Sequence, residues 1–303
     1  MQKSLQLKAP AKLNLFLEVT GKRPDGFHAL ESVFQTISLY DDITISLRDS
    51  ERVDFSCRPE SLQTPDNLAV KAAEAFFTAT GLQAGVHISL EKGIPAQAGL
   101  GGGSSDAAAV LKGLNDLFDR PLDKSALLTL GASLGSDVPF FICGGTALVT
   151  GRGEFVEPVK ADTPFDFLVF FPGFGVSTAE VYKNLRLNLT EKRNSAKVLL
   201  ALLASGSLEA AGEHFFNRLE QAAFALDSRL VEAKTVMQNS VGDAGVMLCG
   251  SGASLFSAFA DHDRAHEAYR ILRGRGMGVA FLAQSIRETG SAWGGKGDSR
   301  GDF

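Results

Sequence analysis

Pro95-Ala-Gln-Ala-Gly-Leu-Gly-Gly-Gly-Ser-Ser-Asp-Ala-Ala-Ala109 is a glycine-rich segment that leads directly into a helix-forming sequence. Its glycines let the backbone turn tightly and approach a ligand without a Cβ in the way. The apolar residues that follow recur at helical spacing, which predicts a helix that begins here with Ser104 or Ser105 as its cap. Free N–H groups and the positive end of the helix dipole would form an anion site, so we predict a phosphorylated ligand.

Two common phosphate-binding signatures do not match this segment. A Walker A loop requires a Lys directly after its last Gly, and here Ser104 follows. A Rossmann fingerprint that starts at Gly99 requires a sixth-position Gly, which is again Ser104. A purely structural turn before a helix is the alternative. Four glycines, two serines and an immediate helix favour phosphate binding.

Strands and helices are predicted to alternate on both sides of the glycine loop. Residues 11–19 alternate between apolar and polar side chains, as in a strand with one buried face. Further strands are expected over residues 33–47, 84–90, 140–143, 167–171, 245–248, 254–259 and 278–283. Helices are expected over residues 67–80, 123–134, 194–204, 208–226, 228–239 and 262–274. This mixture predicts an α+β protein, with a change of domain near residues 152–162.

The composition is that of an ordinary globular protein. The chain has 303 residues, of which 45% are hydrophobic and 21% charged, and two domains are expected at this length. The net charge of −5 argues against a nucleic-acid-binding protein, which usually carries a basic excess. Because the N-terminus lacks a signal-peptide core and no apolar run is long enough to span a bilayer, we expect a cytoplasmic protein with no membrane partner.

Two further features are assigned from composition alone. Cys57, Cys143 and Cys249 match no metal-ligand spacing and are expected to be small core residues. Residues 288–303 are rich in Gly, Ser and charged side chains, and are predicted to form a disordered tail.

Six motifs in order, between about residues 7 and 286, resemble those of the GHMP kinases, small-molecule kinases named for galactose, homoserine, mevalonate and phosphomevalonate. They are Pro10-Ala-Lys-Leu-Asn-Leu15, Asp25-Gly-Phe-His28, the glycine loop, Gly135-Ser-Asp-Val-Pro-Phe140, Phe216-Asn-Arg-Leu-Glu220 and Gly250-Ser-Gly-Ala-Ser254. The resemblance implies a two-domain fold with the active site in the interdomain cleft. It implies a ribosomal-protein-S5-like, ATP-binding domain over residues 1–157 and a ferredoxin-like α/β sandwich over residues 158–287.

The motif set is most similar to that of the family members that phosphorylate a cytidylyl methylerythritol on the non-mevalonate route to isoprenoid precursors. The resemblance implies transfer of the γ-phosphoryl group of ATP to the 2-hydroxyl of that small molecule. ATP is then the co-substrate and Mg²⁺ the expected metal, with no protein ligand assigned to it. A monomer or weak homodimer that binds no nucleic acid is expected. The alternatives are another GHMP kinase, or a non-catalytic nucleotide-binding protein on the same fold.

The resemblance assigns two catalytic residues. Asp137 matches the Asp of the family's Gly-x-Asp-Val-Pro motif and is the candidate base for the acceptor hydroxyl. Lys12 is expected to pair with Asp137 and to stabilise the transferring phosphoryl group. Asn14, on the same strand face as Lys12, is expected to hold the substrate. A capping Asp and a solvent-facing Lys are the alternatives.

The remaining assignments concern ligand binding. By resemblance, the cytosine ring is sandwiched between aromatic side chains and hydrogen-bonded at its polar edge, and Phe27, His28 and Tyr182 match the positions involved. Phe27 stands where the family often has Tyr, which keeps the stacking but removes a phenol hydrogen bond.

Gly250 and Ser251 are predicted to contact the substrate, with a plain strand-connecting turn as the alternative. Residues 216–220 are expected to lie on a helix and to support the fold. The predicted ATP-binding residues are Pro95, Ala96, Gln97, Ala98, Gly99, Leu100, Gly101, Gly102, Gly103, Ser104 and Ser105.

Overall fold

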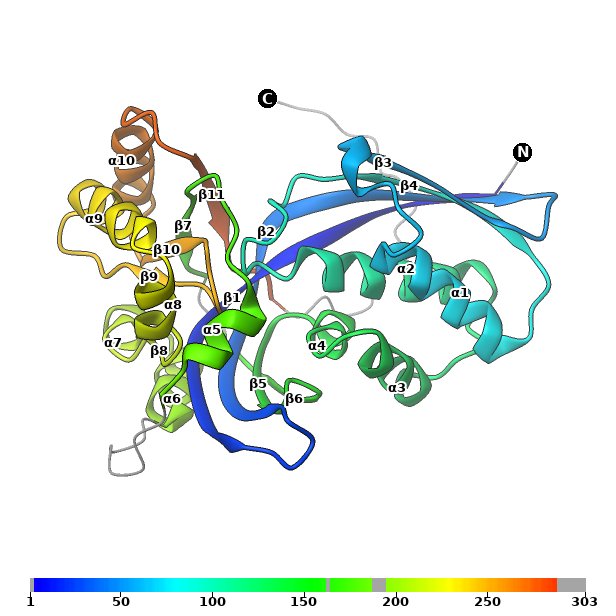
Figure 1. The fold of residues 1–303 in the computed structure, drawn as a ribbon, viewed down its shortest axis with the longest axis horizontal. Helices are drawn as coiled ribbons and strands as arrows, with labels where there is room; N and C mark the ends of the chain where they lie inside the picture. The colour runs from blue at the N-terminus through cyan, green and yellow to red at the C-terminus, as the bar shows by residue number, and fades with distance from the viewer. Residues whose placement is uncertain (1–2, 162–163, 187–194, 288–303) are drawn as a thin grey trace.

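The computed structural model describes residues 3–161, 164–186 and 195–287, which form two lobes that lie side by side (Figure 1). The N-terminal lobe contains a seven-stranded sheet with helices α1 to α4 against one face, and the C-terminal lobe contains a four-stranded sheet with its own helices. This architecture confirms the predicted α+β, two-domain fold. The predicted disordered tail, residues 288–303, lies outside the described residues.

The sheet of the N-terminal lobe is built on the long antiparallel pair β1 and β2. Its strands are β1 Ser4–Lys22, β2 His28–Arg48, β3 Val53–Arg58, β4 Gly85–Glu91, β5 Thr146–Gly151, β6 Phe155–Val159 and β8 Phe216–Asn217. They run in the order β3-β4-β2-β1-β8, with β5 paired to β2 and β6 to β5. The helical elements of this lobe are η1 Glu60–Leu62, α1 Leu68–Thr80, α2 Gly102–Leu117, α3 Lys124–Leu134 and α4 Val138–Cys143.

The C-terminal lobe has the strand order β11-β7-β10-β9. Its strands are β7 Asp166–Phe171, β9 Met247–Leu248, β10 Leu255–Phe259 and β11 Val279–Gln284. Its helices are α5 Thr178–Asn184, α6 Ala196–Ser205, α7 Leu208–Gly212, α8 Glu220–Leu226, α9 Arg229–Val241 and α10 His262–Arg273. The predicted domain limits, 1–157 and 158–287, stay a prediction, and residue 157 lies inside β6.

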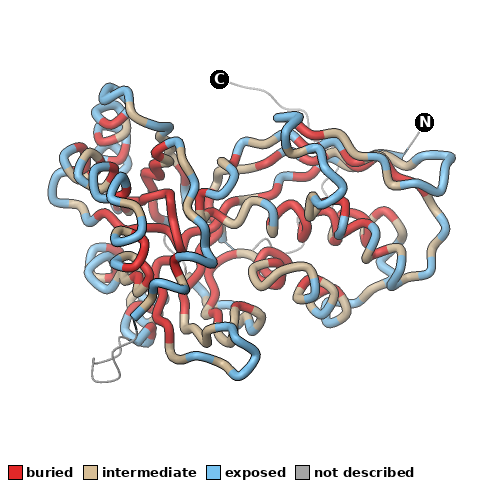
Figure 2. The backbone as a smooth tube through the Cα atoms, in the orientation of Figure 1, coloured by how far each residue is buried: buried red, intermediate tan, exposed pale blue. Residues whose placement is uncertain are grey.

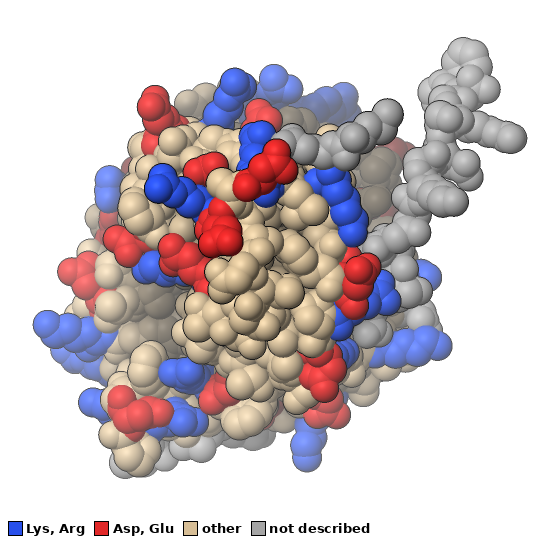
Figure 3. All heavy atoms as spheres, turned by 90° about the vertical axis from the view of Figure 1, so that its right-hand side faces the viewer, with Lys and Arg blue, Asp and Glu red and all other residues tan. Residues whose placement is uncertain are grey.

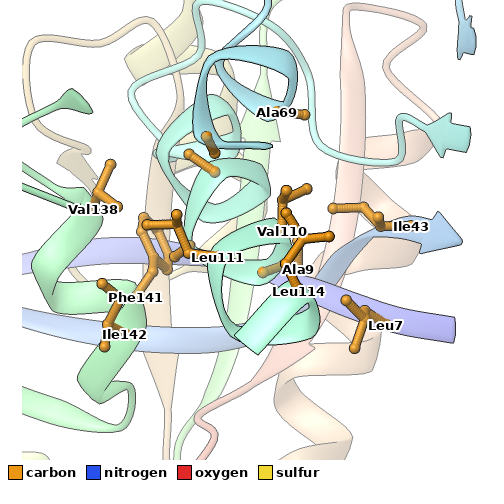
Figure 4. Packing of buried hydrophobic residues seen from close by; sticks show 14 of the residues in the cluster. Leu7, Ala9, Ile43, Ala69, Val110, Leu111, Leu114, Val138, Phe141 and Ile142 are labelled. Carbon is orange, nitrogen blue, oxygen red and sulfur yellow. The ribbon is translucent and has the colours of Figure 1, made fainter. Parts of the chain in front are cut away.

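Helix α2 is the centre of the N-terminal core. Its apolar residues at helical spacing, among them Val110, Leu111 and Leu114, are fully buried between β1, α1 and α4 (Figure 4). Each such Leu contributes about 1.5–3 kcal/mol by leaving water. At Gly113 the helix lies so close to the sheet that an added Cβ would be 2.5 Å from Leu7 Cδ1. Figure 2 shows the same division across the molecule, with buried backbone between the layers and exposed backbone outside. The start of α2, and the glycine loop before it, is therefore held firmly in place.

Two predicted elements are wrong. Residues 140–143 are helical rather than a strand, because Pro139 lies in the first turn of α4, where its missing N–H is not needed, and every residue of this helix is buried. A short apolar run without polar positions has no period that separates strand from helix. The helix predicted over residues 208–226 is interrupted by β8, which pairs in parallel with β1 through Phe16–Phe216 and Leu17–Asn217. The Phe216–Glu220 motif therefore does not lie on one helix.

Several whole-chain expectations can be compared with the described residues. Cys57, Cys143 and Cys249 are all buried, as predicted for core residues. Within the described ranges, no helix combines the length and the apolar content needed to cross a bilayer. The end of the N-terminal lobe, on the right of Figure 1, carries Lys and Arg interspersed with Asp and Glu around an uncharged centre (Figure 3). That face is not the single-sign basic surface typical of nucleic-acid binding.

Candidate active site

A cleft of about 1050 Å³ lies between the two lobes. Both lobes contribute side chains to it, among them Phe34 of β2 and Thr178 of α5. The predicted site residues that line it are Lys12, Asn14, Phe27, His28, Gly99, Gly101, Asp137, Tyr182, Gly250 and Ser251. Nine of these residues come from five of the six motifs and the tenth, Tyr182, lies on α5, so segments far apart in the sequence meet in one cavity. The other residues of the predicted ATP-binding set, Pro95 to Ala98, Leu100 and Gly102 to Ser105, are not part of its lining.

Lys12 lies on β1 and is almost fully buried. Its Nζ donates a 2.6 Å hydrogen bond to Asn14 Oδ1 and lies 4.0 Å from Asp137 Oδ2. The ring of Phe34 lies below the same ammonium, 5.0 Å away. Asn14 is only 1% exposed, and its Nδ2 donates to Ser32 Oγ. The alternation of the strand therefore puts Lys12 and Asn14 on one face, where the carboxamide fixes the position of the ammonium.

Asp137 occupies the N-cap position of α4. Among the described residues, its carboxylate accepts no capping hydrogen bond from that helix, unlike the side chain of a typical N-cap Asp. The side chain is 31% exposed and faces Lys12. The carboxylate therefore does not cap the helix, which was the alternative role for Asp137. It lies partly open to the cleft with a buried cation beside it.

The glycine loop ends in an uncapped helix N-terminus. Helix α2 begins at Gly102, and its N-cap is Gly101, whose φ of +74° is the left-handed conformation that favours glycine. An added Cβ on Gly101 would lie 2.8 Å from the ring of Phe141. The N–H of Ser105 donates to the carbonyl of Gly101, so the N–H groups of the three preceding residues lie ahead of the first helical bond. Those three groups form the predicted anion site.

The prediction that Ser104 or Ser105 caps this helix is wrong. Gly101 holds the cap position without a side-chain bond, and both serines lie in the first turn, because the left-handed turn comes earlier in the glycine run than expected. Ser104 lies beside Gly135, on the segment that leads to Asp137. Ser105 is 1% exposed and lines a separate cavity of about 430 Å³ on another side of the helix. Of the two hydroxyls, the one of Ser104 is therefore nearer to the segment that leads to Asp137.

The glycine loop also contacts the turn Gly250-Ser251-Gly252 of the C-terminal lobe. The N–H of Ser254 donates to the carbonyl of Ala98 at 3.0 Å, and Cys249 Sγ donates to the carbonyl of Gly99 at 3.3 Å. An added Cβ on Gly99 would lie 2.3 Å from the carbonyl oxygen of Cys249. Both lobes therefore fix the loop.

A buried ionic cluster under the start of α2 was not predicted. Lys92 Nζ lies 2.7 Å from Asp106 Oδ2 and also pairs with Asp41, whose other oxygen accepts from the N–H groups of Gly93 and Ile94. Burial raises the pKa of Asp106 to about 8, against the lowering effect of Lys92. Burial by itself would lower the pKa of Lys92, but the two carboxylates outweigh it and raise that pKa. The cluster lies next to the glycine turn at which α2 begins.

One end of the cleft is formed by aromatic rings. His28 and Tyr182 stack on each other with centroids 5.1 Å apart, and burial raises the pKa of Tyr182 to about 12. A flat ring inserted between them would need about 7 Å, twice the contact distance of carbon atoms. In this arrangement the two rings therefore cannot enclose a cytosine. Phe27 is 51% exposed, and the guanidinium of Arg152 lies 5.3 Å over its ring. Phe27 and Tyr182 both line the cleft.

The charge of the cleft suits an anionic ligand. Among its described lining residues, four are Lys or Arg and Asp137 is the one carboxylate; the cations are Lys12, Lys22, Arg152 and Lys183. The last three were not selected from the sequence, because isolated basic residues in loops and helices carry no local signal. In the described part of the chain, no cluster of three or more His, Cys, Asp or Glu side chains could hold a metal ion.

Comparison with known proteins follows this geometry. The sequence pattern described as "GHMP kinases N terminal domain" matches residues 67–145, and that of "GHMP kinases C terminal" matches residues 199–276. The 4-diphosphocytidyl-2-C-methyl-D-erythritol kinase of Brevibacillus brevis is 38% identical over 273 residues, which cover 89% of this chain and 92% of the relative. The enzyme of the same name from Desulfitobacterium hafniense is 37% identical over 279 residues, covering 92% and 95%.

Solved structures agree at two levels of similarity. A crystal structure of 4-(cytidine 5'-diphospho)-2C-methyl-D-erythritol kinase superposes with a TM-score of 0.80 at 37% identity, covering 93% of this chain and 99% of that one. Homoserine kinase from Cytophaga hutchinsonii superposes with a TM-score of 0.70 at 18% identity, covering 95% and 96%. The second similarity concerns the fold alone.

Proposed function

This chain belongs to the GHMP kinase family, and on that premise we propose that it transfers the γ-phosphoryl group of ATP to the 2-hydroxyl of 4-diphosphocytidyl-2-C-methyl-D-erythritol, giving the 2-phosphate and ADP. Relatives of that name share 37–38% of their residues with this chain over about nine-tenths of its length. The reaction belongs to the non-mevalonate route to isoprenoid precursors.

The observation that carries the proposal is the position of the Lys12–Asp137 pair. The two side chains lie 4.0 Å apart, in the cleft that Gly101 also lines, and Gly101 caps the helix whose first N–H groups are available to an anion. Phosphoryl transfer needs little covalent chemistry from the protein, since most of the catalysis is positioning and charge stabilisation. A fixed cation and a carboxylate in one cavity, with a phosphate cradle that begins at Gly101 in its wall, would meet that need.

Each group has a separate role in the proposed reaction. The N–H groups of Gly102, Gly103 and Ser104 would hold the phosphates of ATP, and Mg²⁺ accompanying the nucleotide would neutralise their charge. Asp137 accepts the proton of the acceptor hydroxyl. The ammonium of Lys12, 4.0 Å from Asp137 Oδ2, stabilises the equatorial oxygens of the transferring phosphoryl group. The absence of a carboxylate cluster in the described residues fits a metal that arrives with the nucleotide.

Acceptor choice is proposed to depend on the other end of the cleft. The cytosine would stack between Phe27 and Tyr182 after Tyr182 separates from His28, whose ring would then bond the polar edge of the base. Lys22, Arg152 and Lys183 would face the diphosphate that joins the cytidine to the polyol. Gly250 and Ser251 would contact the substrate between the two ends of the cleft.

The test is ADP formation from ATP and Mg²⁺ with the purified chain. We expect turnover with 4-diphosphocytidyl-2-C-methyl-D-erythritol and background rates with mevalonate, homoserine and galactose. Turnover with one of those three instead would identify a different GHMP kinase. Nucleotide binding by calorimetry without phosphorylation of any acceptor would identify a non-catalytic binding protein.

A further inference from the structure

The Phe216–Glu220 motif has no part in the reaction described so far, yet its Asn217 reaches the back of the active site. Asn217 is 7% exposed and ends β8, whose backbone pairs with Leu17 of β1. The N–H of the next residue, Arg218, donates to the carbonyl of Leu17 at 2.8 Å. The main chain of Asn217 is therefore fixed to the same strand that carries Lys12.

The side chain of Asn217 points into the C-terminal lobe. Its Nδ2 donates to the carbonyl oxygens of Leu248 at 2.8 Å and Gly250 at 2.7 Å, while its Oδ1 accepts from the N–H of Leu219 at 2.9 Å. Two donors and one acceptor on a single short side chain are what only an Asn supplies at this position. An Asp would keep the acceptor and lose both donors.

The segment that Asn217 holds, residues 249–250, packs against Lys12 and Asn14. Gly250 has a φ of +57°, and a Cβ added to it would lie 3.2 Å from Asn14 Oδ1 and 3.5 Å from Lys12 Nζ. Cys249 Sγ lies within hydrogen-bond reach of the carbonyl of Gly99. The backbone of residues 249–250 is thus packed against the ammonium, against the carboxamide that holds it, and against the glycine loop.

We infer that Asn217 is a positioning residue for phosphoryl transfer: its carboxamide fixes the Gly250 turn, and the turn fixes Lys12 against Asn14 and Asp137. The inference rests on the proposed function, because it takes Lys12 as the catalytic cation. Without the two donors, two buried carbonyl groups lose their partners and the turn relaxes towards other partners. Small displacements of an aligned catalytic group are costly, on the order of 100-fold in rate for 1 Å.

The test compares Asn217→Asp with Arg218→Met. The first variant removes both donors and keeps the acceptor for Leu219. The second removes the bidentate pair between Arg218 and Glu18 of β1, in the same segment of the chain. We expect Asn217→Asp to lower kcat by about 10- to 100-fold, with KM for ATP and for the acceptor within about threefold of wild type. Arg218→Met is expected to lower the melting temperature at least as much and to keep kcat within about threefold.

Three kinetic results would overturn the inference: unchanged kcat in folded Asn217→Asp, a parallel rise in both KM values, or an equal loss of kcat in Arg218→Met. If Asn217→Asp does not fold, Asn217→Ser replaces it, since its cavity admits water to the carbonyls. A crystal structure of the folded variant gives a readout that does not depend on activity. We expect the Gly250 carbonyl and Lys12 Nζ to be displaced, and an unmoved ammonium contradicts the inference. Wild-type turnover tests the proposed function separately from the variant-to-wild-type ratio.

Discussion

At one end of the cleft Lys12 is 4% exposed and its ammonium donates to Asn14, whereas at the other end Phe27 is 51% exposed and lies under the guanidinium of Arg152. The first end is fixed from both lobes, through the glycine loop and the Gly250 turn. At the second end, the rings of His28 and Tyr182 stack on each other. A rigid end suits alignment of reacting atoms, and an adaptable end suits binding of a base.

This difference predicts where each substitution acts. Changes at the rigid end remove interactions that matter most in the transition state, so they lower kcat. Changes at the aromatic end remove binding energy that is present in both the ground state and the transition state, so they raise KM. A substitution at the rigid end that raised only KM, or one at the aromatic end that lowered only kcat, would contradict this difference.

The largest effect is expected for Asp137→Asn. The amide keeps the shape of the side chain but cannot accept the proton of the acceptor hydroxyl, so kcat should fall by about 10²–10⁴-fold. The melting temperature should stay close to that of wild type, because the carboxylate is 31% exposed and bonds nothing in α4 among the described residues. Steady-state kinetics and thermal unfolding measure both. A variant with near-normal turnover would remove Asp137 from the mechanism.

Lys12→Ala should follow, with a loss of at least about 100-fold in kcat, as expected for one preorganised donor. The substitution also removes the 2.6 Å hydrogen bond to the buried Asn14 Oδ1, which keeps the weaker donor Cys249 Sγ at 3.8 Å, so a lower melting temperature is expected as well. Lys12→Met is the matched control, because it fills the same space without the charge. If Lys12→Met keeps its turnover, the ammonium is not the catalytic cation.

Tyr182→Ala should act on the acceptor instead. Loss of a stacking ring is worth about 1–3 kcal/mol, so KM for the cytidylyl substrate should rise by about 5- to 150-fold while kcat changes little. Tyr182→Phe keeps the ring, and its KM should stay within about threefold of wild type. An unchanged KM in the Ala variant would contradict stacking, and a fall in kcat alone would show that the two ends of the cleft are not separate.

The features that depend on local sequence could be predicted, and those that depend on contacts between distant segments could not. The strand face shared by Lys12 and Asn14, and the helix that follows the glycine loop, are local patterns, and both are present in the structure. The serine cap was wrong because a left-handed turn at Gly101 depends on how closely Phe141 packs, which no spacing reports. The break of the predicted helix at Phe216 arises from pairing with β1, a strand two hundred residues earlier.

The buried cluster of Lys92, Asp41 and Asp106 shows the limit most clearly. Asp106 lies inside the glycine motif itself, and Lys92 is three residues before its first proline. Nothing in either local pattern indicates that Asp41, inside β2, completes a triad with them. An ion cluster assembled by tertiary contact has no sequence period, so physical reasoning on a single sequence cannot find it.

That cluster gives a prediction about stability instead of activity, a pH dependence of unfolding. Lys92 with Asp41 is already a neutral pair, so ionised Asp106 adds a surplus buried charge, and its pKa in the folded state is about 8. In the unfolded chain an Asp has a pKa near 3.9. Because the folded state holds this proton more tightly, its contribution to stability is complete below the unfolded pKa and is lost as the pH rises through the folded pKa.

Asp106→Asn should remove that dependence, because the amide mimics the protonated acid and does not titrate. Between pH 5 and 8, wild type should lose stability with rising pH relative to the variant, by up to about 1.4 kcal/mol per pH unit. The difference between the two should level off above pH 8, where Asp106 is ionised in both the folded and the unfolded state. Urea unfolding at half-unit intervals measures the difference, and Asp66→Asn, which removes an exposed ion pair, is the control. Parallel pH profiles for wild type and Asp106→Asn would mean that the carboxylate is ionised at neutral pH. The support under the glycine loop would then be a fully charged triad instead of a neutral pair beside a carboxylic acid.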